Sequence, residues 1–344
     1  MTLKRILILF FLTAGFYACS KENIFEAPFT GFQKPANFPE PAYHFATNPV
    51  TKDGFELGRK LFYEPMLSAN NTISCGSCHI QTAAFTHHGH TVSHGIFDRL
   101  GTRNAPPIMN LAWNNSFMWD GGIADMDLQA IAPITNHVEM DESLANVLQK
   151  LRNSTTYPAM FKKAYGSDSI TTAGFLKALS QFMAMCVSSN SKYDSVKRNQ
   201  GAVFTNNEQE GYLLVKQKCT PCHQEPLFTD NSFRNNGLSI STVNDLGRYL
   251  VTQHDTDQYK FKVPGLRNLS YTAPYMHDGR FLTLEAVLDH YINGVQKTAN
   301  LDPVFQQQST PGIPLTNDEK QKILAFLKTL DDKSFLLDKR FSEE

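Results

Sequence analysis

The sequence contains the same short pattern twice, and this repetition limits the folds open to the chain more than any other feature. Each copy has two cysteines three positions apart and a histidine directly after the second cysteine. The copies are Cys75, Cys78 and His79, and then Cys219, Cys222 and His223. Any fold must therefore place two thiols and one imidazole within about one turn of chain, at two positions far apart in the sequence.

Covalent haem attachment explains this pattern better than its alternatives. Two cysteines form thioethers to one haem, and the adjacent histidine supplies an axial nitrogen to its iron. A four-cysteine zinc site would not need a histidine after each pair. Two local disulfides would strain short loops, and a thioredoxin-like pair belongs to a βαβ setting that is absent here. We therefore expect two haem c groups, with His79 and His223 as iron ligands.

The N-terminus indicates export. Lys4 and Arg5 precede a short apolar run and small residues before Cys19, so residues 1 to 19 are predicted to be a signal peptide of the lipoprotein type. Cys19 would then carry a lipid that anchors the protein in the periplasm, and ordinary cleavage nearby is the alternative. The proline-rich residues 20 to 45 are predicted to be an extended tether. The remaining cysteine, Cys186, is expected to be a buried apolar residue.

The charge balance excludes some partners. Thirty-two basic side chains nearly cancel thirty-three acidic ones, so no long-range field would attract nucleic acid or an anionic membrane surface. We expect no nucleic-acid partner, and membrane contact only through the lipid.

Apolar residues recur at helical spacing along most of the chain and predict a mostly α protein. Helices are expected at 55–62, 124–132, 142–152, 157–165, 173–188, 207–215, 283–293 and 315–330. A helix precedes each haem motif, which indicates an internal duplication. We therefore predict two tandem cytochrome c-like domains, residues 46–200 and 201–335, each with a covalent haem, joined through the polar stretch 189–205.

Further motifs surround the two haem motifs, in an order that resembles bacterial di-haem cytochrome c peroxidases. MauG, the di-haem enzyme of methylamine utilisation, belongs to the same superfamily. The resemblance covers nearly all of residues 46 to 335. Its motifs are Asn104-Ala105-Pro106, Met118-Trp119-Asp120-Gly121, Leu128-Gln129-Ala130, Pro133-Ile134, Val138-Glu139-Met140 and Thr272-Ala273-Pro274-Tyr275-Met276-His277-Asp278-Gly279.

The resemblance implies roles for individual residues near the first haem. In the family the N-terminal haem meets peroxide and the C-terminal haem receives electrons. Glu139 matches the acid-base carboxylate, Gln129 the amide that orients peroxide, and Trp119 the tryptophan between the haems. Four histidines follow the first motif, and among them His94 matches the removable distal ligand, with His90 as the alternative.

The resemblance also implies a calcium ion and leaves one iron ligand open. Asn104, with the backbone carbonyls of Thr272 and Pro274, matches a calcium site, and oxygen ligands suit that cation. Typical peroxidases have a methionine as the distal ligand of the C-terminal haem, whereas Tyr291 stands at the matching position here, as in MauG. Met276 or His290 are alternatives, and Tyr291 could instead only pack.

The predicted function is a di-haem cytochrome c peroxidase that reduces hydrogen peroxide to water. Its electrons would come from a small periplasmic cytochrome c or cupredoxin, and family habit suggests a homodimer. Two alternatives stay open: a MauG-like di-haem oxidase that acts through high-valent haem, which Tyr291 favours, and a non-catalytic di-haem electron carrier, which Glu139 opposes.

Overall fold

The computed structural model describes residues 29 to 307 and 309 to 343. The predicted signal peptide, Cys19 and the first part of the predicted tether lie outside these residues. Within the described part of the chain, no helix is long and apolar enough to cross a bilayer.

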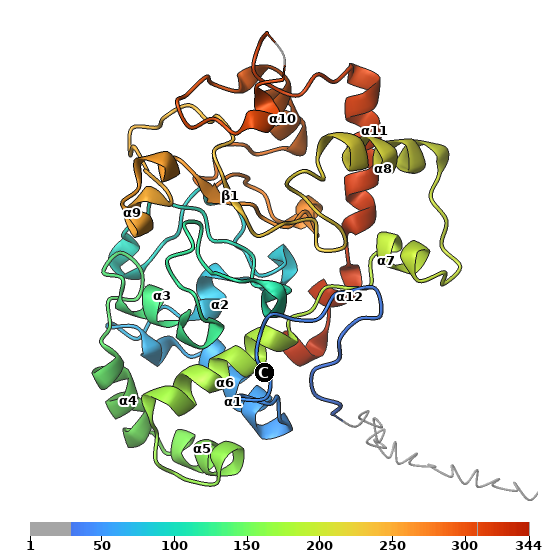
Figure 1. Cartoon of the computed structure of the whole chain (residues 1–344). Helices are drawn as coiled ribbons and strands as arrows, with labels where there is room; N and C mark the ends of the chain where they lie inside the picture. Colours follow the sequence, from blue (N-terminus) through green and yellow to red (C-terminus); the bar gives the residue numbers. More distant parts are fainter. Residues whose placement is uncertain (1–28, 308, 344) are drawn as a thin grey trace, which may run out of the picture. The chain divides into compact units, whose positions relative to one another are not determined.

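The structure is mostly helical, as predicted (Figure 1). The α-helices are α1 (Lys52–Phe62), α2 (Cys75–Cys78), α3 (Ile131–Thr135), α4 (Leu144–Asn153), α5 (Tyr157–Tyr165), α6 (Thr172–Met185), α7 (Lys192–Lys197), α8 (Asn206–Lys218), α9 (Tyr249–Thr252), α10 (Leu284–Asp289), α11 (Asn317–Leu327) and α12 (Lys333–Leu336). Two short strands, β1 (Phe233–Arg234) and β2 (Phe261–Lys262), pair antiparallel, with Phe233 opposite Lys262. A π-helical turn, η8 (His290–Gly294), continues α10.

Most predicted helices are confirmed. They were predictable because local capping patterns mark where they begin. Thr205 and Glu208 form a capping box at the start of α8, and Thr316 and Glu319 form another at the start of α11. The helix predicted over 124–132 is different: the Asp125 side chain caps a 3-10 turn, η5 (Met126–Leu128), and α3 begins only afterwards.

A helix crossing is repeated in the two halves of the chain and supports the predicted duplication. Helix α1 packs on α6, and α8 packs on α11 (Figure 1). In the first crossing, a Cβ at Gly58 would clash with the Ala178 carbonyl oxygen and stand 3.0 Å from Phe182 Cβ. In the second, a Cβ at Gly211 would clash with the Lys322 carbonyl oxygen and stand 3.0 Å from Phe326 Cβ. Glycine is thus required at both points of closest approach.

Each crossing helps to form an apolar core beside one haem motif. The rings of Phe62, Phe85 and Phe182 pack together in the first half. In the second half, a buried cluster forms around Tyr193, Phe228 and Phe326. By its contacts, the chain from Gly31 to Glu344 is one compact unit, and the division into domains 46–200 and 201–335 stays a prediction.

The described end of the predicted tether is part of this folded unit. Phe38 is buried against Trp113, and Phe32, Tyr43 and Phe45 pack on the same cluster. The Trp113 indole N–H donates to the Pro39 carbonyl oxygen at 2.9 Å. The prediction of an extended tether over residues 20 to 45 is therefore wrong from Phe32 onward, because these aromatic side chains pack on the folded unit.

Candidate haem and peroxide site

The first haem motif lies on the short helix α2. Ser74 and Ser77 form a capping box that starts the helix, and Gly76 leaves room for the Tyr63 ring, with which a Cβ would clash. Cys75 and Cys78 are free thiols. The pair therefore stays open to thioether formation.

The histidines of both motifs are partly buried and oriented in the same way. His79 Nδ1 lies 2.7 Å from the Phe85 carbonyl oxygen, and His223 Nδ1 lies 3.0 Å from that of Phe228 and 3.1 Å from that of Pro264. Burial lowers the pKa of both imidazoles. A neutral ring whose Nδ1 is held by a backbone carbonyl leaves Nε2 for a metal, as is usual for metal-ligating histidines. Both motifs therefore fit a haem iron.

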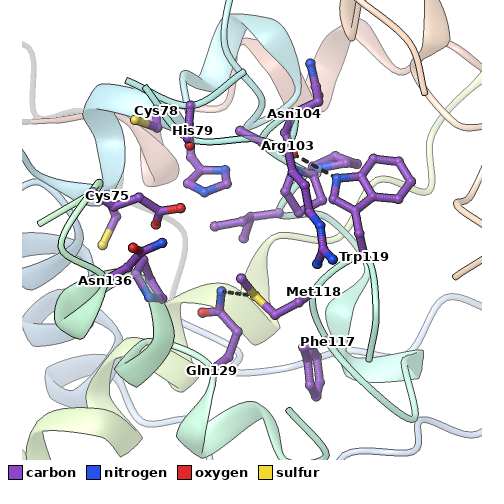
Figure 2. A pocket seen from close by; sticks show the side chains of 18 of the residues that line it. Cys75, Cys78, His79, Arg103, Asn104, Phe117, Met118, Trp119, Gln129 and Asn136 are labelled. Atoms are coloured by element: carbon purple, nitrogen blue, oxygen red, sulfur yellow. Dashed lines mark hydrogen bonds between the residues drawn. The ribbon is translucent and has the colours of Figure 1, made fainter. Parts of the chain in front are cut away.

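Each motif borders a cavity. The first cavity, of about 670 Å³, contacts Cys75, Cys78 and His79. In Figure 2 the His79 ring and the amides of Gln129 and Asn136 point into this space. The second cavity, of about 210 Å³, contacts Cys219, Cys222 and His223 and is mostly apolar. At both places, two thiols and an available imidazole nitrogen border a cavity, and these are the groups that would hold haem c.

Glu139 and Gln129 both line the first cavity, as the resemblance implies. Burial raises the pKa of Glu139, and this effect outweighs the nearby Asn136 and Ser93 side chains. The Gln129 amide nitrogen lies 4.0 Å from the Met118 sulfur (Figure 2). The cavity thus holds a carboxyl group that binds a proton more tightly than an ordinary glutamate, and an amide that can bind a small polar molecule.

Of the four histidines after the first motif, His94 lines the first cavity and His87, His88 and His90 do not. The His94 carbonyl oxygen lies 3.4 Å from Cys78 Sγ, and the His90 ring packs 4.4 Å from the His94 ring, centroid to centroid. His87 is buried, and neither of its ring nitrogens has a hydrogen-bond partner. The geometry is compatible with His94 as a distal ligand and places His90 behind it.

Trp119 lines both cavities. Its indole N–H donates to the Asn104 carbonyl oxygen at 2.8 Å (Figure 2).

The three predicted calcium ligands all border the second cavity. They are Asn104, Thr272 and Pro274. No group of three His, Cys, Asp or Glu side chains suited to a metal ion occurs in the described part of the chain, but the predicted ligands are an amide and two carbonyls.

Tyr291 and Met276 line the second cavity, whereas His290 does not. The His290 Nε2 atom instead lies 3.1 Å from the Asn236 carbonyl oxygen. Tyr291 stacks on Phe305 with ring centroids 5.6 Å apart, and burial raises its pKa to about 12. It lies in the π-helical turn η8, a feature common at functional sites.

Sequence reasoning gave no role to several residues that the structure places at the cavities. Met118 contacts Gln129, Ser93 and Asn136 lie beside Glu139, and Lys262 lines both cavities. Asn136 stands three residues before Glu139, and this short spacing could have indicated that the two side chains lie together. The position of Lys262 depends on a contact with a distant segment that no local pattern reports.

Comparisons with known proteins find chains that are similar in sequence. The family model described as di-haem cytochrome c peroxidase matches residues 52–202. The methylamine utilization protein MauG of Methylorubrum extorquens is 34% identical over 87% of this chain and 83% of that protein. Cytochrome c551 peroxidase of Nitrosomonas europaea is 35% identical over 83% of this chain and 82% of that protein.

A solved structure is also similar. A MauG-like protein associated with microbial copper homeostasis matches with a TM-score of 0.80 and 33% identity, over 91% of this chain and 98% of that one. The diheme peroxidase BthA from Burkholderia thailandensis has the same fold, with a TM-score of 0.73 at 20% identity.

Proposed function

Because the chain belongs to the di-haem cytochrome c peroxidase and MauG family, we propose that it reduces hydrogen peroxide to water. The two electrons per peroxide would come from a small periplasmic cytochrome c or cupredoxin. The proposal extends to residues: His79 and His223 as iron ligands, His94 as the displaceable ligand, and Glu139 and Gln129 as the groups that act on peroxide.

One observation carries the proposal: the two cavities differ in their acidic groups. Three carboxyl groups line the first cavity. Two of them, Asp120 and Asp245, bind Arg103 at 2.5 and 2.6 Å, which leaves Glu139 without an ion pair in the described structure. No Asp or Glu lines the second cavity. Proton transfer is thus supported at the first cavity only, and the second suits electron transfer.

When bound, haem supplies an iron that binds peroxide and a conductor for electrons. The chain's own residues supply the rest. Glu139 accepts a proton from one peroxide oxygen and delivers it to the other, which becomes water. A raised pKa suits a group that must both gain and lose a proton near neutral pH. The Gln129 amide orients the peroxide, and Trp119, on the wall of both cavities, lies where electrons would pass.

The proposal is tested by steady-state peroxide turnover with a reduced small cytochrome c. We expect Glu139→Gln to lower kcat about 100-fold or more, which is the usual contribution of a positioned acid-base group. Asp141→Asn is the matched control, because Asp141 pairs with Arg99 outside the cavity. Wild-type turnover no faster than that of free haem would refute the peroxidase proposal.

A MauG-like oxidase that acts on a partner protein is the second candidate, and Tyr291 on the wall of the second cavity favours it. One equivalent of peroxide added to the oxidised protein without a donor separates the two functions. A visible spectrum that stays changed for minutes supports the oxidase. A spectrum that recovers at once, together with rapid turnover of reduced cytochrome, supports the peroxidase. A protein that shows neither turnover of reduced cytochrome nor a lasting spectral change with peroxide would be the electron carrier.

A further inference from the structure

One wall is common to both cavities and contains an unusual charge. Eight residues border both spaces: Asn104, Pro107, Met109, Trp119, Lys262, Pro264, Gly265 and Arg267. Two of these side chains are cationic and none is acidic. The wall between the two predicted haems therefore has an excess of positive charge.

The arginine of this wall already has a partner. Arg267 is fully buried and binds the buried Asp194 with two hydrogen bonds of 2.7 and 2.8 Å. The same is true of Arg234 on the second cavity, which binds Asp230 and Asp302 at 2.8 and 2.9 Å. Local carboxylates thus neutralise these guanidinium groups before any ligand is present.

Lys262 differs from these arginines. Its amine makes no hydrogen bond or ion pair with any residue from 29 to 307 or 309 to 343, and burial lowers its pKa to about 8. Lys262 is partly buried and borders both cavities, so an anionic partner in the cavities would stabilise its unpaired ammonium. The backbone holds the residue in place: the Lys262 N–H donates to the Trp119 carbonyl oxygen at 2.7 Å, and β2 pairs with β1.

We propose that the Lys262 ammonium pairs with propionate carboxylates of the cofactors in both cavities and raises the reduction potential of both. This inference rests on the proposed function, because it assumes that each cavity holds a haem. Haem carries two propionate groups, which are anionic at neutral pH. A positive charge on the common wall favours the reduced state of each iron, since reduction removes one unit of positive charge nearby.

Lys262 would then be a positioning and electrostatic residue rather than a catalytic one. A purely structural lysine would contribute through its four-carbon stem, which methionine can replace. Charge and packing are therefore separable by substitution. Lys262→Met keeps most of the stem and removes the charge, Lys262→Gln removes the charge in a polar form, and Lys262→Arg keeps the charge.

The test is a redox titration of the holoprotein, followed by visible spectra that resolve the two haems. We expect Lys262→Met and Lys262→Gln to lower the reduction equilibrium constant of each haem about tenfold, or 59 mV for one electron. Lys262→Arg should stay within about threefold of the wild type. Lys260→Met is the matched control: it removes the same charge two residues away, where Lys260 pairs with Asp257 at 3.2 Å and borders neither cavity.

Potentials of both haems within twofold of the wild type in Lys262→Met and Lys262→Gln would overturn the inference, as would a shift at one haem only. An equal shift in Lys260→Met would also overturn it, because the effect would then not be local. If both neutral variants fail to hold haem while Lys262→Arg holds two, the charge is needed for binding and the pairing is supported. Haem content of the wild type, measured as pyridine haemochrome, is a separate test: fewer than two haems per chain would refute the proposed function itself.

Discussion

Gly95 lies directly against the backbone of Glu139: a Cβ at position 95 would stand 2.5 Å from Glu139 Cα. The next residue reinforces this contact, because the Ile96 N–H donates to the Glu139 carbonyl oxygen at 2.8 Å. The segment that carries His94 and the turn that carries Glu139 are thus fixed to each other.

Substitution of Gly95 should therefore affect both residues together. A methyl group cannot fit without a backbone shift, so we expect Gly95→Ala to cost about 1–3 kcal/mol of unfolding free energy. Peroxide turnover should fall about 100-fold, since small displacements of reacting groups have effects of this size. Gly174→Ala in α6 is the control, because its Cβ would meet nothing closer than 3.3 Å. Full turnover in Gly95→Ala would show that the contact is irrelevant to the site.

Glu139→Gln should stabilise the protein although it lowers peroxide turnover. Burial raises the pKa of Glu139, so the folded state binds a proton more tightly than the unfolded state. At pH below the pKa that Glu139 has in the unfolded chain, the group is protonated in both states and the folded state is most stable. This stability is lost as pH rises through the raised pKa of the folded state. The variant should therefore unfold at a higher temperature than the wild type at pH 7, with the difference shrinking toward pH 4. A difference independent of pH would contradict this.

Tyr291→Phe should alter the visible and EPR spectra of the C-terminal haem. Tyr291 and Met276 both reach the second cavity, but a phenolate and a thioether give irons of different potential and spectrum. We propose Tyr291 as the ligand, so Met276→Leu is the control and should leave the spectra unchanged. If Met276→Leu alters the spectra and Tyr291→Phe does not, Met276 is the iron ligand.

The proposed calcium site predicts metal-dependent stability. Asn104, Thr272 and Pro274 offer oxygen ligands beside the second cavity. At a free calcium concentration of about 100 times Kd, binding should add about 2.7 kcal/mol to the unfolding free energy. Chelation should lower Tm and added calcium should restore it, whereas Asn104→Ala should show neither response. One calcium per chain by elemental analysis would agree, and none would refute the site.

The buried pair of Asp194 and Arg267 should be important for stability. Burial alone would raise the pKa of Asp194, but the hydrogen bonds and charge of Arg267 outweigh it and hold the pKa below its usual value. Asp194→Asn leaves the guanidinium buried and unpaired, so we expect a loss of about 3–5 kcal/mol in urea unfolding.

Asp289→Asn is the control for this pair. It breaks the ion pair with Lys320, in which the Asp289 side chain is 60% exposed, and should cost less than about 1 kcal/mol. Equal losses in the two variants would show that burial does not govern the effect. Because the Asp194 pKa is lowered, its stabilisation should be lost as pH falls below the usual aspartate range.

The sequence predicted the features that local patterns encode. Helix α11 was evident from its cap at Thr316 and its apolar spacing, and Cys75, Cys78 and His79 form a motif by adjacency alone. The resemblance to the family pointed to Glu139, Gln129 and Trp119. Only the folded structure shows that they line one cavity. Lys262 could not be found, because its place on the wall of both cavities depends on a backbone contact with Trp119, which lies far away in the chain.

The two glycine crossings, at Gly58 and at Gly211, have a consequence for how experiments on this molecule can be interpreted. Two halves with the same crossing geometry and the same histidine anchoring are an internal control for each other. A property that both halves share reflects how a haem pocket is constructed. A property found in one half alone, such as Glu139 without an acidic counterpart at the second cavity, reflects a difference in what the two cavities do. Exchanging single side chains between equivalent positions would thus measure how few substitutions turn the proposed electron relay into a site that reacts with peroxide.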